Sequence, residues 1–135
     1  MMKKETLPSA DAWLREAKAD VAAADCGMFL LHNGVVRRSA KARVRAGDTS
    51  AADVRGMRFS YDQEKAAAAI REAEAMEGIR VVRVWMNEGV LSVGDDIMYV
   101  LVGGDIRPHV IDALQALVGR LKSECVTEEE LPQLL

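Results

Sequence analysis

The stretch VLSVGDDIMYVLV, residues 90–102, decides the fold class of this chain. Gly94 and Asp95 in its middle are typical of a tight turn, and the apolar run over residues 97–102 predicts a buried strand. A link this short favours strands that run in opposite directions, because parallel strands need a crossover of a dozen or more residues. The stretch therefore predicts antiparallel pairing.

Further strands are expected outside this stretch. Residues 28–36 form a mostly apolar run with an Asn-Gly bend inside it, and residues 54–61 form a second candidate strand. Residues 79–86 alternate apolar side chains with Arg83 and Trp85, which is the period of a strand. The links between the strands are short, which again favours antiparallel pairs.

The clearest helix spans residues 62–77, where apolar and charged residues recur at helical spacing and Ser60 or Asp62 can cap the start. A last helix begins at Pro108, a residue that suits the first helical position. A short first helix begins after Ser9. Its apolar face comprises Trp13, Ala17 and Val21. Helices packed on a mostly antiparallel sheet define the α+β class.

The composition bounds the class of protein. The chain has 135 residues, of which 50% are hydrophobic and 29% charged, and its formal net charge is −3. This length fits one domain, residues 1–135, with a real core. No apolar run approaches the roughly 20 residues that cross a bilayer, and the start of the chain lacks the apolar segment of a secretory signal, so we expect a cytoplasmic protein without membrane contact. The slightly negative charge makes nucleic acid an unlikely partner.

Neither the cysteines nor the histidines suggest a metal site. Cys26 and Cys125 lack CxxC spacing and a His cluster, so we expect two free, buried thiols and no zinc. His32 lies in a predicted strand, where a packed or edge histidine is typical. His109 has no evident acid partner in the sequence and is expected on the surface. We therefore expect no metal and no cofactor.

Charge is unevenly distributed along the chain. Residues 37–47 carry five cations and no acid, which predicts a mobile basic loop over about residues 38–52. Three consecutive glutamates mark an acidic tail over about residues 126–135. A charge run is usually a solvated surface, and this basic loop lacks the interleaved aromatic residues that favour nucleic-acid binding.

Single cations also occur at the ends of predicted elements. Arg37 closes the first strand, and Arg107 precedes the last helix, whose N-terminal dipole favours anions. Lys122 is near the C-terminus of that helix, where its simplest role is to complement the dipole. A helix between Arg107 and Lys122 separates them by roughly 22 Å. If both serve one site, a second copy of the chain must contribute one of them, which predicts a dimer.

Three segments resemble the large, catalytic subunit of molybdopterin synthase, the MoaE family. GMFLLHNGVVR, residues 27–37, is similar to the family's G-A-x-x-x-F-x-G-x-V-R segment, and GVLSVGDDI, residues 89–97, to its G-x-L-x-x-G-D-x-I segment. The stretch from Arg107 to Lys122 resembles the one between the family's His-Arg pair and its catalytic lysine. We interpret the chain as a divergent member.

The resemblance implies an α/β hammerhead-like fold, a homodimer and a partner, a ubiquitin-like small subunit with a C-terminal Gly-Gly. A thiocarboxylate on that tail would supply sulfur to cyclic pyranopterin monophosphate, an anionic pterin phosphate, in molybdenum cofactor biosynthesis. By the same resemblance Lys122 is the catalytic lysine and Arg37 binds the substrate anion. Arg107 would join a phosphate-binding group supplied by the neighbouring protomer, and Arg38 is a further candidate for substrate binding.

The chain departs from the family pattern at two positions. Ile106 stands at the family's histidine, and Glu129 stands where a P-x-W-K segment supplies a second lysine. An anion in place of a cation changes the local charge by about two units and repels anionic partners. Lys41 and Arg38 are candidates to replace that lysine. Two interpretations stay open: an active sulfurtransferase, or a non-catalytic dimeric binding module that has lost synthase activity.

Overall fold

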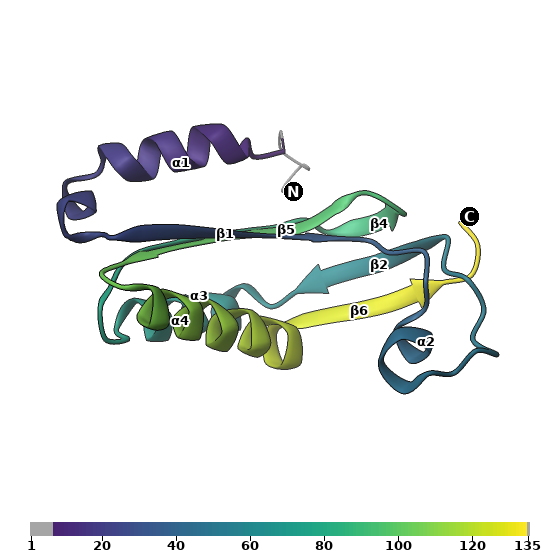
Figure 1. The fold of residues 1–135 in the computed structure, drawn as a ribbon. Coiled ribbons are helices and arrows are strands. Elements are labelled where there is room, and N and C mark those ends of the chain that lie inside the picture. The colour runs from purple at the N-terminus through teal and green to yellow at the C-terminus, as the bar shows by residue number, and fades with distance from the viewer. Residues whose placement is uncertain (1–6, 135) are drawn as a thin grey trace.

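Two antiparallel sheets of three strands each form the scaffold of residues 7–134, the part of the chain that the computed structural model describes (Figure 1). The first sheet has the order β1 (Met28–Val35), β5 (Asp96–Gly104), β3 (Ile79–Met86). The second has the order β4 (Gly89–Ser92), β2 (Gly56–Tyr61), β6 (Val126–Leu131). Every pair of neighbours is antiparallel, which confirms the predicted α+β class.

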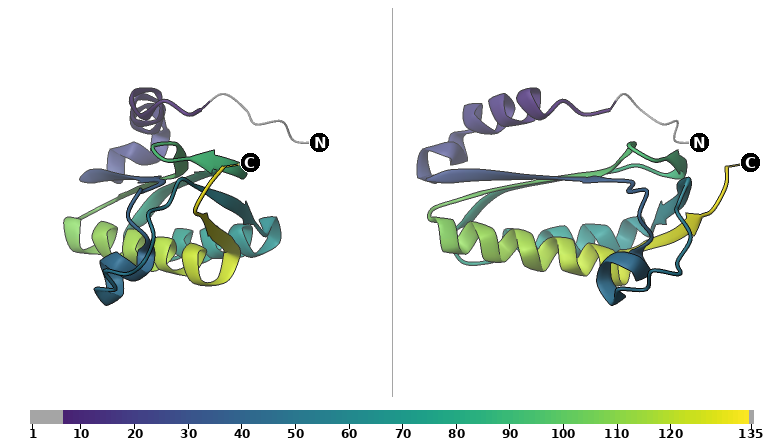
Figure 2. Two further views of the ribbon diagram at one scale, coloured as in Figure 1. Left: turned by 90° about the vertical axis from the view of Figure 1, so that its right-hand side faces the viewer. Right: turned by 45° about the vertical axis from the view of Figure 1, so that its right-hand side comes forward.

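Helices cover both faces of the first sheet (Figures 1 and 2). One face carries α1 (Ala10–Ala19), and the other carries α3 (Gln63–Glu74) and α4 (Arg107–Arg120). The side chain of Ser9 accepts a hydrogen bond from the backbone N–H of Ala12, and that of Asp62 accepts one from Lys65. These caps, and a proline in the first turn of α4, confirm the predicted starts of the three helices.

The apolar run of β5 is continuous because both of its faces are covered. Val100, Leu101 and Val102 are fully buried. Val100 and Val102 join the core beneath α3 and α4, whereas Leu101 packs with Trp13 and Ala17 of α1. The predicted buried strand is thereby confirmed.

The turn between β4 and β5 holds the end of β1. Gly94 has a φ of +94°, the left-handed conformation that a glycine adopts without strain. Its N–H donates to the backbone oxygen of Val36, and the N–H of Val36 donates to the oxygen of Asp95. These two hydrogen bonds fix the backbone of Val36. The chain leaves the sheet here, so the position of Arg37, the next residue, is fixed as well.

Part of the segment expected as a mobile basic loop is helical. The short helix α2 (Lys41–Ala46) ends at Gly47, whose φ is +69°. The Arg43 guanidinium lies 3.1 Å from the carboxylate of Asp53 and donates to the backbone oxygen of Ala51. The prediction of a mobile loop rested on the excess of cations over residues 37–47. Asp53, the acid that pairs with Arg43, lies after that segment in the chain.

The acidic tail differs more strongly from the prediction, because it supplies the edge strand β6. Its backbone pairs with β2 over residues 126–131. Arg58 lies directly opposite Glu129, and their side chains form an ion pair of 2.8 Å. Glutamate is depleted in strands, and this cross-strand pair compensates for part of that low propensity.

Two predictions at the other end of the molecule are wrong. Val21 is 91% exposed rather than on the buried face of the first helix, because α1 ends at Ala19 and Asp20 caps a separate 3₁₀ turn, η1 (Val21–Asp25). His109 does have acid partners: its Nδ1 lies 2.8 Å from Asp105, and its Nε2 lies 3.6 Å from Glu77. The hydrogen bond to Asp105 raises the pKa of His109 and lowers the pKa of Asp105.

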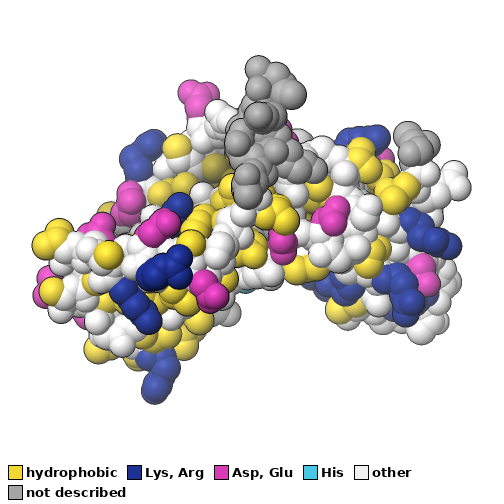
Figure 3. All heavy atoms as spheres, turned by 90° about the horizontal axis from the view of Figure 1, so that it is seen from above, with side chains coloured by type: hydrophobic (Ala, Val, Ile, Leu, Met, Phe, Trp, Pro, Cys, Tyr) yellow, Lys and Arg dark blue, Asp and Glu magenta, His cyan; other side chains and the backbone are white. Residues whose placement is uncertain are grey.

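The remaining expectations concern the surface and the thiols. Cys125 is buried as expected and Cys26 is half-buried, and both are free. Lys and Arg side chains occur at both ends of the face seen in Figure 3, with Asp and Glu among them. Over residues 7–134 no helix has the length and apolar character needed to cross a bilayer. The start of the chain, where we expect no secretory signal, and Leu135 of the acidic tail lie outside the described residues.

Candidate functional site

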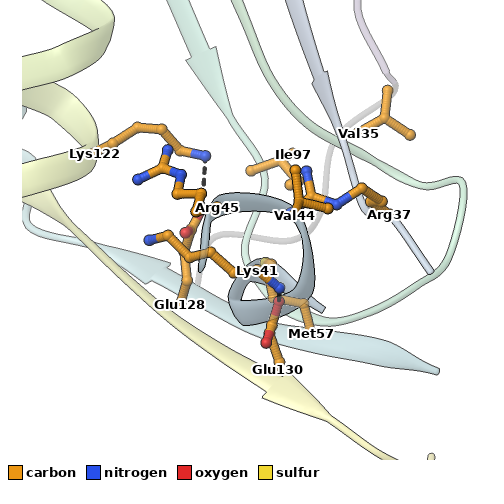
Figure 4. Close-up of a pocket in the computed structure, with 10 residues that line it drawn as sticks. All are labelled: Val35, Arg37, Lys41, Val44, Arg45, Met57, Ile97, Lys122, Glu128 and Glu130. Atoms are coloured by element: carbon orange, nitrogen blue, oxygen red, sulfur yellow. Dashed lines mark hydrogen bonds and ion pairs between the residues drawn. The ribbon is translucent and has the colours of Figure 1, made fainter. Parts of the chain in front are cut away.

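A pocket of about 430 Å³ opens where the end of β1, helix α2, the end of α4 and strand β6 meet (Figure 4). Its apolar lining comprises Val35, Val44, Met57 and Ile97. Its charged lining within the described part of the chain comprises Arg37, Lys41, Arg45, Lys122, Glu128 and Glu130. Four cations against two carboxylates leave an excess of two positive charges in a chain whose formal charge is −3. Such a pocket favours a multiply charged anion.

Lys122 reaches the pocket from a turn of π-helix that follows α4. This turn, η2 (Leu121–Cys125), is anchored in the core by its first and last residues, Leu121 and Cys125, which are both buried. The Lys122 side chain points into the pocket, and its Nζ lies 3.1 Å from Oε2 of Glu128. π-turns are rare and occur frequently at functional sites. Lys122 therefore lines the pocket in addition to following the C-terminal end of α4.

Arg37 reaches the pocket from the other side (Figure 4). Its Nε donates a hydrogen bond of 2.9 Å to the backbone oxygen of Ser39, which orients the guanidinium. Arg37 forms no ion pair within residues 7–134. A guanidinium presents forked donors that match the oxygens of a phosphate. The fold thus brings together two of the site residues predicted from the sequence, Arg37 and Lys122.

Arg38 and Arg107 are not part of this pocket. Arg38 is exposed and is fixed through its backbone oxygen, which accepts a hydrogen bond from the N–H of Val54. Arg107 is exposed at the first turn of α4, whereas Lys122 follows the last turn. A helix of this length separates the two by roughly 22 Å, so one chain does not bring them to one ligand.

Two cations of α2 line the pocket and were not predicted as a pair. Lys41 and Arg45 are four residues apart, a spacing that places both on one face of a helix. The four-residue spacing is visible in the sequence, but it places two side chains on one face only in a helix, and this segment was predicted to be a loop. Of the two candidates to replace the family's second lysine, Lys41 lies in the pocket and Arg38 does not.

Strand β6 contributes carboxylates that sequence reasoning also missed. Side chains alternate along a strand, so Glu128 and Glu130 face the pocket while Glu129 faces away and pairs with Arg58. Oε2 of Glu130 accepts a hydrogen bond of 2.8 Å from the backbone N–H of Lys41 and so caps α2. The charge reversal expected at Glu129 therefore acts outside the pocket, and the anion beside Lys122 is Glu128.

His32 lies in β1 near Lys122. It shares a face of the strand with Met28 and Leu30, which pack against the core beneath α4. Burial lowers the pKa of His32, and the charge of Lys122 lowers it further. His32 is thus a half-buried histidine on an edge strand of the first sheet, in agreement with the packed or edge histidine expected from the sequence. No three His, Cys, Asp or Glu side chains of residues 7–134 lie close enough together to hold a metal ion.

The fold and the pocket together define a two-sheet α+β protein in which a lysine and an arginine line one cationic pocket. The family model described as MoaE protein matches residues 8–124, and the chain belongs to this family. The resemblance seen in the sequence is therefore confirmed. Membership supports a role in molybdenum cofactor biosynthesis and a synthase-type enzyme. No curated protein sequence matches the chain.

Solved structures with the same fold are distant in sequence. Molybdopterin synthase from Staphylococcus aureus is 16% identical with a TM-score of 0.68, and the match covers 92% of this chain and 85% of that one. A MoaE protein from Burkholderia ambifaria is 19% identical with a TM-score of 0.68, over 91% and 76% of the two chains. A complex of subunits 1 and 2 of molybdopterin-converting factor from Helicobacter pylori is 13% identical with a TM-score of 0.64, over 91% and 78%. These likenesses show a shared fold.

Proposed function

We propose that this chain is the large subunit of a cytoplasmic molybdopterin synthase. It takes sulfur from the C-terminal thiocarboxylate of a ubiquitin-like small subunit and transfers it to cyclic pyranopterin monophosphate. One observation carries the proposal: Arg37 and Lys122, matched to the family through separate segments, line the same cationic pocket. The small-subunit partner is further supported by the H. pylori neighbour, which is a complex of two subunits.

The residue types of the pocket suit this chemistry. The guanidinium of Arg37 binds phosphate in a forked geometry, while the ammonium of Lys122 is a compact charge that can give or accept a proton. When sulfur leaves the thiocarboxylate and bonds to a carbon of the pterin, the carbon–sulfur bond of the tail breaks and water supplies the oxygen of the carboxylate that remains. Cations beside the reacting carbonyl stabilise the oxyanion formed in this step.

A homodimer is part of the proposal because Arg107 lies at the far end of α4 from Lys122. In a dimer that places the start of α4 of one protomer beside the pocket of the other, Arg107 adds a fifth cation to the site. Arg38 is exposed next to Arg37 and is available to a substrate that extends beyond the pocket.

The test is conversion of the pterin precursor to molybdopterin by purified protein with a thiocarboxylated small subunit. Lys122→Ala is expected to abolish product, because it removes the cation that faces the reacting groups. Lys18→Ala is a matched control, since Lys18 lies in the last turn of α1 on the other face of the first sheet. Normal conversion by the Lys122 variant would refute the assigned role.

A non-catalytic binding module is the second candidate, and the carboxylates of Glu128 and Glu130 inside the pocket favour it. They compete with an anionic substrate for the same cations. This candidate predicts that the wild-type protein yields no molybdopterin in the assay above, although inorganic phosphate still binds. Steady product formation would exclude it.

A further inference from the structure

The carboxylate of Glu128 is more buried than the other carboxylates of this protein that form ion pairs in the described part of the chain. Its side chain is 16% exposed, whereas every other paired acid of residues 7–134 is at least 38% exposed. The partner is Lys122, with Nζ at 3.1 Å from Oε2. A carboxylate removed this far from water depends on its partner for compensation.

The geometry of the pair is that of a charge contact and not of an aligned hydrogen bond. Oε2 of Glu128 is buried and has no hydrogen bond of good geometry in the described part of the chain, even though the ammonium of Lys122 is within 3.1 Å. Buried polar side-chain atoms normally have at least one hydrogen-bond partner. Oε2 of Glu128 is therefore held beside Lys122 by charge and not by an aligned hydrogen bond.

The second carboxylate of the pocket behaves differently. Glu130 accepts a hydrogen bond from the backbone N–H of Lys41 and holds the start of α2. Glu130 thus has a structural task, whereas within residues 7–134 the side chain of Glu128 pairs with Lys122 alone. Figure 4 shows the two acids entering the pocket from the same strand, with Lys122 reaching toward Glu128.

We propose that Glu128 is an internal counterion that occupies Lys122 in the free protein and is displaced when an anionic group, of the phosphate class, enters the pocket. Glu128 then acts as a positioning residue that sets the affinity of Lys122 for anions. The inference deepens the proposed function, because the substrate named there carries such a group, but anion binding requires neither the small subunit nor sulfur transfer.

The first test measures binding of inorganic phosphate to the full chain by calorimetry. Glu128→Gln removes the competing charge at constant size and is expected to lower the dissociation constant about tenfold. Glu129→Gln is the matched control on the same strand: it removes the same charge, but Glu129 pairs with Arg58 outside the pocket, so the constant should change less than about twofold. Unchanged or weaker binding by Glu128→Gln would overturn the inference.

A double-mutant cycle tests whether the charge of Glu128 weakens phosphate binding through Lys122. If Glu128 competes for Lys122, the gain from Glu128→Gln largely disappears in a Lys122→Ala background. An equal gain in that background would mean that Glu128 acts on the pocket as a whole, and displacement from Lys122 would be wrong.

A measurement on the wild-type protein covers the case in which a variant fails to fold. With ¹³C-labelled glutamate, the side-chain carboxyl signal of Glu128 should shift when phosphate saturates the pocket, because the carboxylate leaves the ammonium of Lys122. An unshifted signal at saturation counts against displacement. If synthase activity is absent while the signal shifts, the proposed function fails and the counterion role of Glu128 stands.

Discussion

Leu121→Ala tests whether the buried first residue of the π-turn supports the lysine that follows it. Leu121 is fully buried in the main core and lies directly before Lys122. Shortening leucine to alanine removes roughly three carbons, worth about 0.8 kcal/mol each, and the cavity left behind adds about 1 kcal/mol. The free energy of unfolding should therefore fall by about 3 kcal/mol.

Urea unfolding followed by circular dichroism measures this loss directly. For a chain of 135 residues, a loss of about 3 kcal/mol corresponds to a fall in Tm of roughly 10 °C. Leu7→Ala is the matched control, because Leu7 is 49% exposed and its truncation should cost less than about 0.5 kcal/mol.

The same variant has a consequence for the pocket. If Leu121 fixes the turn that carries Lys122, Leu121→Ala should also weaken phosphate binding under conditions where the protein remains folded. A loss of stability below about 1 kcal/mol would refute the packing account of the turn. Unchanged phosphate binding in a destabilised variant would refute the link between the turn and the lysine.

Two further predictions concern charged contacts outside the pocket. In a double-mutant cycle with Arg58→Ala and Glu129→Ala, the coupling energy from urea unfolding should be about 0.2–1 kcal/mol, since both side chains are about half exposed; a coupling above about 2 kcal/mol would contradict a surface pair. The raised pKa of His109 means that its ion pair with Asp105 stabilises the fold below the unfolded pKa of about 6.5, and that this stability is lost as the pH rises through the folded pKa. Wild type should therefore exceed His109→Gln in stability by more at about pH 5.5 than at about pH 9, and a pH-independent difference would show that protonation of His109 has no role.

Much of the fold could be predicted because the decisive patterns are local. The caps at Ser9 and Asp62 and the turn at Gly94 depend on residues a few positions apart, and each is observed. The continuous apolar run of β5 likewise predicts a strand that is buried on both of its faces, and this burial is observed. Arg37 and Lys122 could be noticed because they stand at the ends of such elements, and the family resemblance then suggested them as site residues.

The rest of the site could not be predicted because it depends on partners far apart in the chain. Glu130 caps a helix that begins at Lys41, and Arg58 neutralises Glu129 across two strands. Without those partners, a run of five cations suggests a loop and a run of glutamates suggests a tail. The carboxylates of the pocket were missed for this reason.

The sequence by itself determined the α+β class, the antiparallel pairing and the presence of cations at the ends of two elements, because propensity, caps and periodicity act within a few residues. Only the tertiary structure decided which charges meet. It placed Arg37 and Lys122 in one pocket, turned Glu129 away and set Glu128 against the lysine. The physical reason is that electrostatic contacts depend on distance in space, and in this chain that distance is set by the packing of β6, α2 and the π-turn around a common core.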